Sequence, residues 1–417
     1  MKIKSNLVFD KHNDELIGFV DLGDPDTNYN CFGEEENNLA THALIFYLRG
    51  LMTTLKYCFA YFGTTGITST QLMPIFWEAV FILEKLCSLK VIAATSDGAS
   101  ANRSFFKLHK FLVFNTNNTV CYRTLNLFET SRYIYFFADA PHLLKTARNC
   151  LRHSSFGKDG TRIMWNNGQY LLWQHIVEMH QQDLQQGLKL LPKITDQHVF
   201  LNSFSVMTVK FAVQVLSNTM STVLEKFGPK EATETAKYCF FLDKFFDCLN
   251  VRHPDEHIRK RKPFLKPYTS EEDPRFDWLE NSFLKYFEEW KCSTENRLGE
   301  FSKKDRNNMF ISQQTYEGLC ITTTSVIEIT KYLLSQGFQY VLTERFCQDP
   351  AEEYFGAQRQ HGRRCENPDL YEFGYNANIL RIQKEVSHSS GNSRGKYNKK
   401  RSWESVTDQP LPKRKSK

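Results

Sequence analysis

The 417-residue sequence predicts an α/β fold that is divided by a long, mostly helical block. The first observation is that residues 1–151 alternate between apolar runs of strand length and stretches with helical spacing, in the order β-β-β-α-β-α-β-α. The second is that helical spacing dominates residues 152–340. One more helix is expected at 350–361, so the α/β fold would be assembled from two distant parts of the chain.

The strands expected in the first part are short apolar runs next to turn residues, and they lie at 2–9, 15–22, 43–48, 90–95 and 133–138. Asn13-Asp14 supplies turn residues for a hairpin between the first two strands. The run at 43–48 would also fit an apolar helix. Residues 24–39 are polar and acidic, and we expect them to form a surface loop.

Helices are expected between these strands at 70–89, 100–112 and 141–151. The first has an apolar stripe formed by Leu72, Ile75, Phe76, Val80, Leu83 and Leu86. Ser100 can cap the second helix, and Pro141 suits the first turn of the third. In the later block, helices are expected at 169–190, 203–226, 231–250, 277–291 and 323–336, with a Pro- and charge-rich loop at 253–274.

Composition excludes several classes of protein. No apolar run approaches 18 residues, so we expect no membrane span. The 11 cysteines form no C-x-x-C pair, which predicts reduced thiols and no zinc site. The net charge is +6, but residues 387–417 hold nine Lys/Arg and two acidic residues, about +7, which leaves the rest near −1. We expect this basic tail to be disordered, and the body is not a uniformly basic nucleic-acid binder.

Three carboxylates follow segments that would hold them rigidly. Asp97 follows the apolar run at 90–95, Asp139 follows the run at 133–138, and Glu352 lies in the first turn of the last helix. Such carboxylates suit a two-metal phosphoryl-transfer site, in which Mg²⁺ ions roughly 3.5–4 Å apart contact the attacking and leaving oxygens. Simpler explanations exist for each: an Asp97-Gly98 turn, an N-cap at Asp139, and a capping box from Asp349 to Glu352.

Two basic features could contact phosphates. His142, Lys145 and Arg148 share one helix face, which could equally be an ordinary solvated face. The clusters 399–401 and 413–417 have the spacing of a bipartite nuclear import signal or of a non-specific phosphate-binding arm, and they would also suit a merely soluble tail. No G-x-x-x-x-G-K-[ST] motif is present, which excludes a P-loop GTPase.

The order of these segments resembles the P element-type DNA transposases, including the THAP-domain-linked group. The resemblance covers roughly residues 1–385. It rests on the opening hairpin Met1–Gly23, Ser96-Asp97-Gly-Ala-Ser100, Asp139-Ala-Pro-His142-Leu-Leu-Lys145, Val206-Met-Thr-Val-Lys210-Phe-Ala and, most specifically, Gln348-Asp-Pro-Ala-Glu352. The family's zinc-binding THAP module has no counterpart here. Its first catalytic aspartate belongs to an Asp-Glu pair just before the methionine that corresponds to Met1.

The resemblance implies an RNase H-like catalytic fold split by a helical insertion that binds GTP. It implies DNA strand cleavage and transfer at a DDE-type site that uses Mg²⁺ or Mn²⁺. Asp97 and Glu352 would be catalytic residues and metal ligands, and Asp139 would be a neighbour of the site. The implied domains are 1–151 (RNase H-like, first part), 152–340 (insertion), 341–386 (RNase H-like, final helix) and 387–417 (basic tail).

The resemblance also points to nucleotide contacts, namely Lys210 with phosphates, Asp247 and Asn250 with the nucleotide, and Asp349 with the guanine edge. Helix-surface or capping roles explain each of them equally well. The implied partners are transposon-end and target DNA, further copies of the chain in a homo-oligomer, and a nuclear import receptor, with a location in the nucleus. Because the sequence starts after the Asp-Glu pair, the alternative is a truncated or domesticated, catalytically inactive relative that binds DNA or GTP in the nucleus.

Overall fold

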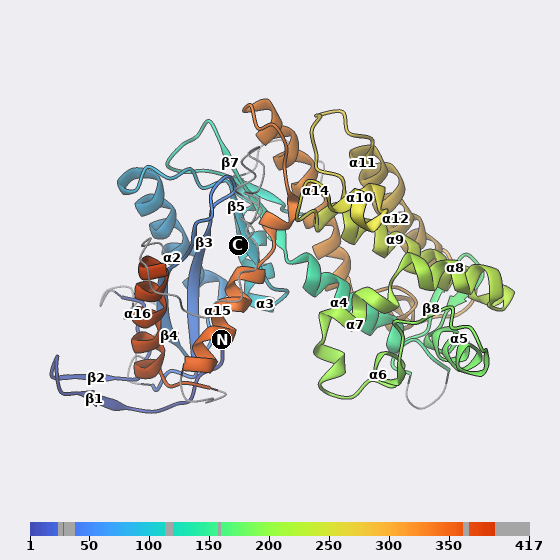
Figure 1. Cartoon of the computed structure of the whole chain (residues 1–417), viewed down its shortest axis with the longest axis horizontal. Helices are drawn as coiled ribbons and strands as arrows, with labels where there is room; N and C mark the ends of the chain where they lie inside the picture. The colour runs from blue at the N-terminus through green and yellow to red at the C-terminus, as the bar shows by residue number, and fades with distance from the viewer. Residues whose placement is uncertain (24–27, 29–37, 113–119, 157–159, 362–366, 388–417) are drawn as a thin grey trace, which may run out of the picture.

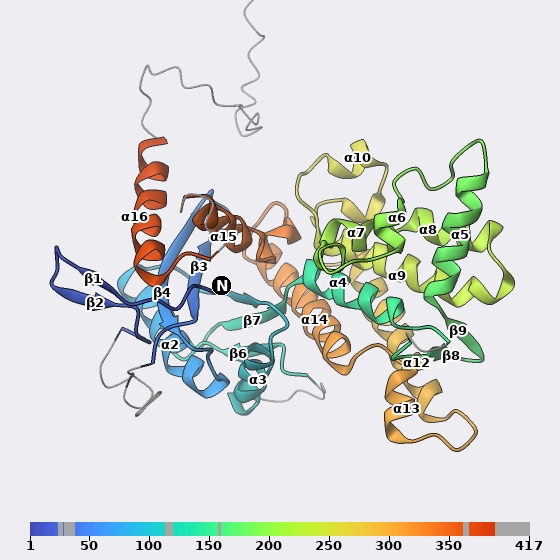
Figure 2. The ribbon, with the colours of Figure 1, turned by 90° about the horizontal axis from the view of Figure 1, so that it is seen from below.

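The computed structural model describes residues 1–387 except 24–27, 29–37, 113–119, 157–159 and 362–366. An α/β region, formed by the early and late parts of the chain, lies beside a helical region formed by the middle (Figures 1 and 2). Contacts between distant segments hold the α/β region together. For example, the Thr95 hydroxyl donates a hydrogen bond of 2.7 Å to the carbonyl of Phe346, 251 residues later.

Strands form the middle layer of the α/β region. β3 (His42–Arg49) pairs antiparallel with β4 (Lys56–Thr64), and β5 (Ala93–Ser96) pairs in parallel with β7 (Tyr133–Ala138). β7 also pairs antiparallel with β6 (Arg123–Leu125). A separate hairpin consists of β1 (Val8–Asp10) and β2 (Glu15–Ile17).

Helices cover both faces of this strand layer. α2 (Ser69–Phe81) and α3 (Ser100–Leu108) lie on one face, and α15 (Asp349–His361) and α16 (Leu370–Ser387) lie on the other (Figure 2). α4 (Ala140–Arg152) and α14 (Gln313–Ser335) lie between the α/β region and the helical region (Figure 2).

β7 lies at the centre of the core because its side chains are apolar on both faces, as expected for a strand covered by helices on both sides. The ring of Phe136 stacks on Phe106 of α3 at 4.5 Å between centroids. On α14, the Ser325 hydroxyl donates to the Phe136 carbonyl at 2.6 Å. Gly318 permits this close approach, since a Cβ there would lie 2.5 Å from Leu143 and 3.3 Å from the Cβ of Ala138. α14 therefore packs directly on the strand layer.

The helical region surrounds α9 (Thr233–Leu249), on which Tyr238, Phe245 and Phe246 are buried. The Tyr238 hydroxyl donates to the Ala147 carbonyl of α4 at 3.0 Å, and Phe245 stacks on Phe283 at 4.5 Å. The other elements of this region are β8 (Met164–Asn166), β9 (Gln169–Leu171), α5 (Trp173–Gln185), α6 (Asp196–Val199), α7 (Val209–Val215), α8 (Asn218–Phe227), α10 (Glu256–Lys260), α11 (Pro274–Asp277), α12 (Lys285–Glu295) and α13 (Lys303–Asn308).

Several sequence-based expectations for the elements are wrong. β4, β6 and the β8–β9 hairpin were not predicted, and the helix expected at 169–190 begins only at Trp173. The apolar stripe expected at 70–89 is buried from Leu72 to Leu83, but Leu86 is 70% exposed. The cause is a π-helical turn at Ile82–Leu86, because its longer turn rotates the stripe away from the core. The helix expected at 203–226 is broken before Ser217, whose hydroxyl caps α8.

Other expectations hold. The segment at 43–48 is a strand rather than a helix, and the strand at 133–138 has the predicted bounds. The tail at 387–417 and most of the loop at 24–39 lie outside the described residues. Among the described helices, none combines the length and apolar character needed to cross a membrane.

Candidate active site and nucleotide-binding residues

The two candidate aspartates lie at the same edge of the strand layer. Asp97 directly follows β5 and Asp139 directly follows β7, and these parallel strands are in register with Ser96 opposite Ala138. The amide of Asp139 donates to the carbonyl of Ser96 at 3.0 Å. Because the carboxyl ends of parallel strands share one edge, the two side chains start about one strand spacing, roughly 4.8 Å, apart.

Asp139 has a structural role at this edge. Its side chain is 1% exposed and caps α4, with Oδ2 accepting from the backbone amide of His142 at 3.2 Å and from His142 Nδ1 at 2.7 Å. Its other oxygen, Oδ1, accepts from the backbone amide of Gln348 at 2.9 Å. Asp139 thereby fixes the start of α15 against the end of β7, and it positions Glu352 one turn further along.

Asp97 and Glu352 have exposed carboxylates. Oδ1 of Asp97 accepts from the amide of Ala99 at 3.0 Å and from the side chain of Asn102 at 2.8 Å. Oε1 of Glu352 accepts from the Gln348 side chain at 3.3 Å. Within the described residues, neither carboxylate forms an ion pair.

Asp97 and Glu352, which together with Asp139 are called here the carboxylate cluster, act electrostatically on the same two cations. Lys145, on α4, is 8% exposed; burial lowers the pKa of its ammonium group, and Glu352, Asp139 and Asp97 oppose that shift. Burial likewise lowers the pKa of the Met1 amine, again against the effect of Glu352 and Asp97. The same carboxylates therefore act on both cations, and the negative potential of the cluster favours positive charge at this point.

Asp97 and Glu352 offer the type of ligand atom that a hard divalent cation takes. Carboxylate oxygens are the preferred ligands of Mg²⁺, and Asp97 and Glu352 are accessible and free of ion pairs in the described part of the chain. Both are also held on firm supports, since Asp97 ends a strand and Glu352 lies in the first turn of a helix. A metal held here would have Asp97 and Glu352 as its ligands.

The prediction that His142, Lys145 and Arg148 form a phosphate-binding or solvated face is wrong for Arg148, and the solvated alternative is also wrong for Lys145, which is 8% exposed. Arg148 is fully buried, and its Nη2 donates to the Val206 carbonyl at 2.7 Å. Burial lowers its pKa to about 10. Arg148 therefore joins α4 to the segment that precedes α7, and it is inaccessible to DNA.

Asp247 lies in a buried ionic group on α9. It is 4% exposed, its neighbour Asp243 is 5% exposed, and Lys262 Nζ lies 2.9 Å and 3.0 Å from the two Asp247 oxygens and 3.0 Å from Asp243 Oδ1. Burial, followed by the charge of Asp243, raises the pKa of Asp247 to about 6, while Lys262 opposes the shift. Sequence analysis missed Lys262, because it lies in a charge-rich loop where no spacing singles it out.

Asn250 and Asp349 are brought together by Arg252, which sequence analysis also missed. Arg252 Nε donates to Asn250 Oδ1 at 2.8 Å, and its Nη2 lies 3.0 Å from Asp349 Oδ2. Asp349 is the first residue of α15 and not its N-cap, because the Gln348 carbonyl accepts the first helical hydrogen bonds. Lys210 lies apart from these residues, exposed in the first turn of α7.

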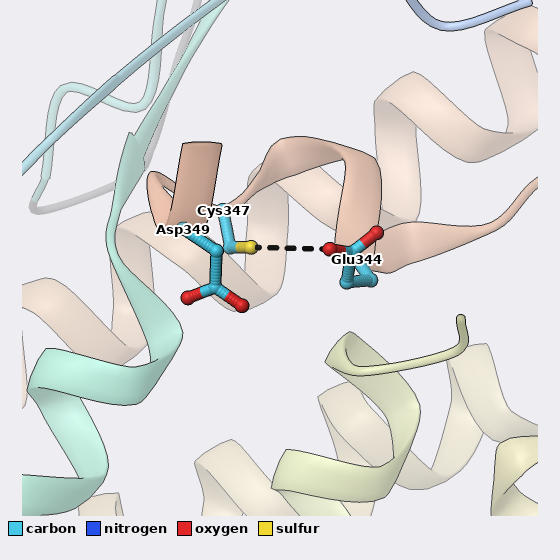
Figure 3. A group of neighbouring side chains, drawn as sticks. All are labelled: Glu344, Cys347 and Asp349. Carbon is cyan, nitrogen blue, oxygen red and sulfur yellow. Dashed lines mark hydrogen bonds between the residues drawn. The ribbon is translucent and has the colours of Figure 1, made fainter. Parts of the chain in front are cut away.

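Glu344, Cys347 and Asp349 form another group with metal-ligand character (Figure 3). The Cys347 thiol points toward Glu344, with 3.9 Å between Sγ and Oε1 (Figure 3). Burial, with the nearby charges of Asp349 and Glu344, raises the pKa of Cys347 to about 12, so the thiolate that would bind a metal is disfavoured. Arg49 pairs with Glu344 at 2.7 Å and Arg252 pairs with Asp349, so these carboxylates are already neutralised by protein cations. The contacts of Glu344 and Asp349 are therefore those of ion pairs that stabilise the fold.

Comparison with known proteins shows which proteins this chain resembles. Residues 1–110 match the model of a TNP-like RNase H N-terminal domain, and residues 141–262 match that of a TNP-like GTP-binding insertion domain. The Drosophila melanogaster protein "Transposable element P transposase" is 26% identical over 248 residues, 58% of this chain. Two regions of this chain thus match TNP-like domain models, and the chain is similar to the P element transposase.

A solved structure supports the same fold. The "Drosophila P element transposase strand transfer complex" matches with a TM-score of 0.69 and 21% identity, over 93% of this chain and 76% of that one. The predicted α/β, RNase H-like fold with a helical insertion is thereby confirmed. The sequence match to the Drosophila melanogaster protein covers 29% of that protein's length.

The matched regions include some of the candidate residues. Asp97 lies in the matched RNase H region, and Lys210, Asp247 and Asn250 lie in the matched GTP-binding region. Asp349 and Glu352 lie beyond both matched regions, and hydrogen bonds of Thr95 with Phe346 and of Asp139 with Gln348 join the start of α15 to β5 and β7.

Proposed function

We propose that this P element transposase homologue is the catalytic part of a transposase that cleaves DNA strands and joins them to a target, at a DDE-type site with Mg²⁺ or Mn²⁺ and with GTP as cofactor. The observation that carries the proposal is that Asp139 links the end of β5, where Asp97 follows, to the start of α15, where Glu352 lies. Its amide donates to the Ser96 carbonyl and its carboxylate accepts from the Gln348 amide. A bound divalent ion would supply charge stabilisation for attacking and leaving oxygens.

The chain's own residues would divide the work at this site. Asp97 and Glu352 hold the cation, and Asp139 keeps α15 in register with β7 through its bonds to His142 and Gln348. The Met1 amine lies within the electrostatic influence of Glu352 and Asp97. An Asp-Glu pair placed directly before Met1 would enter the same cluster.

The test is DNA nicking by the full chain carrying Asp-Glu directly before Met1. We expect conversion of supercoiled plasmid to the nicked form with Mg²⁺ or Mn²⁺, and its loss in Asp97→Asn and in Glu352→Gln, which keep shape but remove charge. Glu353→Gln is the matched control, since Glu353 is exposed and pairs with Lys56 instead of facing the cluster. Nicking that survives Asp97→Asn and Glu352→Gln would refute the assignment.

Asp139→Asn separates a positioning role from metal binding. We expect Asp139→Asn to weaken nicking because α15 is misplaced. The Mn²⁺ concentration that gives half-maximal activity should stay within about threefold of its value in the chain without this substitution. If Asp139→Asn abolishes nicking while Asp97→Asn does not, Asp139 is the second metal ligand and Asp97 is only a turn residue.

GTP would bind in the matched insertion region. Arg252, with Asn250 and Asp349 as its partners, presents a guanidinium group that is half exposed and suited to phosphate or to a guanine carbonyl. Lys210 is a further accessible cation for phosphate, and Asp247 would act indirectly by holding Lys262. Titration calorimetry with GTP and Mg²⁺ should give micromolar binding, as a rough guess for a site without a P-loop, that weakens in Lys210→Ala and in Arg252→Ala. No heat on folded protein would remove GTP from the proposal.

The alternative proposal is a catalytically inactive relative that binds DNA or GTP in the nucleus. The same nicking assay distinguishes the two, since DNA binding without nicking in the Asp-Glu-extended chain favours the inactive relative. Nuclear location rests on the basic clusters at 399–401 and 413–417, which lie outside the described residues. Imaging of tagged full-length chain beside a deletion of 396–417 tests it, and equal nuclear signal would show that these clusters are not the address. A homo-oligomer is a further part of the proposal, which sedimentation analysis tests.

A further inference from the structure

The loop that follows α9 concentrates positive charge. Residues 252–266, called here the α10 loop, contain six Lys/Arg and two acidic residues, whereas the chain up to residue 386 is close to neutral as a whole. Five of these basic residues are exposed, namely Arg252, Arg259, Lys260, Arg261 and Lys266. The α10 loop is therefore a local positive patch on a body whose charges otherwise balance.

Two arginines of this loop have no partner in the described part of the chain. Lys262 is neutralised by buried aspartates of α9, and Lys260 pairs with Glu256 at 2.5 Å. Among the described residues, no side chain or carbonyl accepts a hydrogen bond from the guanidinium groups of Arg259 and Arg261. These two groups are therefore available to a partner outside the chain.

The backbone of Arg261 is unusual for this residue type. Arg261 ends α10 in the left-handed conformation, with φ 53° and ψ 40°. Its amide donates to the Ile258 carbonyl at 3.2 Å, and the next amide, of Lys262, donates to the His257 carbonyl at 3.0 Å. Glycine is favoured at such a helix end, because a Cβ is strained at positive φ. Ending the helix therefore does not explain an arginine at this position, and its side chain needs a role of its own.

The α10 loop is joined to the segment that leads into α15. Arg252 Nη2 lies 3.0 Å from Asp349 Oδ2, and the Val251 carbonyl accepts from the Glu344 amide at 3.3 Å. Asp349 begins α15, and Glu352 of the carboxylate cluster lies in its first turn. Figure 2 shows α10 and α15 on the same side of α4 and α14. A partner bound to the loop is thus held in a fixed position relative to Glu352.

We propose that the α10 loop binds the phosphate backbone of duplex DNA, with Arg259 and Arg261 each contacting a phosphate. This inference rests on the proposed function, in which DNA is the substrate, and it assigns the surface that holds the duplex beside the carboxylate cluster. A guanidinium group matches phosphate oxygens through two parallel hydrogen bonds. Lys262 supports the loop from below, since its ammonium group is fixed by Asp243 and Asp247.

The composition of the loop favours DNA over a protein partner. Within residues 252–266, Ile258 is the one large apolar side chain with a high exposure, at 67%. The centres of protein–protein interfaces are apolar and rich in aromatic residues, whereas protein–DNA interfaces are polar and strongly positive. The exposed surface of the α10 loop has the second character.

DNA binding at several salt concentrations tests the proposal without reference to nicking. In the full chain, Arg259→Ala combined with Arg261→Ala should weaken binding of a labelled duplex at least about tenfold near 100 mM salt. The plot of log affinity against log salt should become about 1.8 units less steep, since each phosphate contact contributes about 0.9. All variants keep the basic tail, so a difference between them comes from the loop.

The matched control removes the same charge elsewhere. Lys303→Ala combined with Lys304→Ala changes two exposed cations of α13, which Figure 2 shows on the opposite side of the helical region from α10. This pair should leave the affinity within about twofold, because it lies away from the duplex. Equal losses in the two double variants, or no loss in Arg259→Ala with Arg261→Ala, would overturn the proposal.

Arg261→Gly separates DNA contact from a structural role. Glycine relieves the strain of the left-handed backbone, so the melting temperature should stay the same or rise while DNA binding weakens. A lower melting temperature with unchanged DNA binding would show that Arg261 only ends α10, and the proposal would fail for this residue.

Further outcomes identify which statement fails. If polyglutamate binds the full chain more tightly than the duplex at equal charge, and loses that binding in Arg259→Ala with Arg261→Ala, the loop recognises acidic protein and the DNA proposal is refuted. If duplex binding depends on the loop but the Asp-Glu-extended chain does not nick, the catalytic function fails while this inference holds. If the extended chain nicks and the loop variants bind DNA normally, only this inference fails.

Discussion

Replacing Lys262 by methionine should strongly destabilise the helical region. Lys262 Nζ makes three contacts of 2.9–3.0 Å with Asp243 and Asp247, whose side chains are 5% and 4% exposed. Methionine keeps much of the volume but leaves two buried carboxylates without a cation. Removing one partner from a buried ionic group costs about 3–5 kcal/mol, and we expect a loss of this size at pH 8.

The loss should depend on pH in a defined direction. In the folded protein the pKa of Asp247 is about 6, raised from 3.8 chiefly by burial. Between these values the folded state holds a proton that the unfolded state has released, so this group's contribution to stability falls as pH rises from about 4 to 6. Without Lys262 the pKa of Asp247 rises further, and protonation removes one of the two unpaired charges at low pH. The difference between wild type and Lys262→Met should therefore be smaller at pH 5 than at pH 8.

Urea unfolding at pH 5 and pH 8, followed by tryptophan fluorescence, measures both effects. Lys56→Met is the control, because Lys56 and its partner Glu353 are 39% and 69% exposed and such a pair contributes less than about 1 kcal/mol. Adding Asp247→Asn to Lys262→Met should recover part of the loss by removing a buried charge. A loss below about 1 kcal/mol at pH 8, or a larger loss at pH 5, would refute the reasoning.

Three further substitutions test packing and capping. Asp139→Ala should lower the free energy of unfolding by about 2–4 kcal/mol, because it removes a helix cap and leaves the Gln348 amide without its acceptor; urea unfolding measures this. Arg148→Met should cost about 1–3 kcal/mol, since the Val206 carbonyl loses its buried donor, and DNA binding by electrophoretic shift should be unchanged because Arg148 is buried. Gly318→Ala should cost about 1–3 kcal/mol in thermal unfolding, because the added Cβ would lie 2.5 Å from Leu143.

The sequence predicts those elements whose signal is local. β7 has the predicted bounds because Tyr133–Ala138 is an uninterrupted run of aromatic, branched and small apolar residues followed by a helix-capping Asp139. The β8–β9 hairpin also has a local signal, the Asn167-Gly168 pair, although a helix was predicted near this segment. Both residues have positive φ, 45° and 88°, as an Asn-Gly hairpin turn requires. β4 alternates poorly and packs on α16, an element that was not predicted, so its strand character depends on tertiary contacts.

The candidate site was predictable only in part. Asp97 and Glu352 were selected from the resemblance, and no local pattern places residues 255 positions apart beside the same lysine. Arg252, which joins Asn250 to Asp349, and Lys262, which joins Asp243 to Asp247, have no sequence signal of their own. The partner of a charged side chain depends on which surfaces the fold brings together, and hydrophobic periodicity does not predict those partners.

The edge of β3 and the carboxylate cluster meet at Met1, which links the strand layer to the chemistry of the site. Met1 is bonded to Ala43 on the β3 edge, and its amine lies within the field of Glu352 and Asp97. A residue joined to Met1 must therefore enter the ladder beside β3 and the cluster at the same time. A carboxylate added in that position would be held beside β3, as Asp97 is held by β5 and Glu352 by α15.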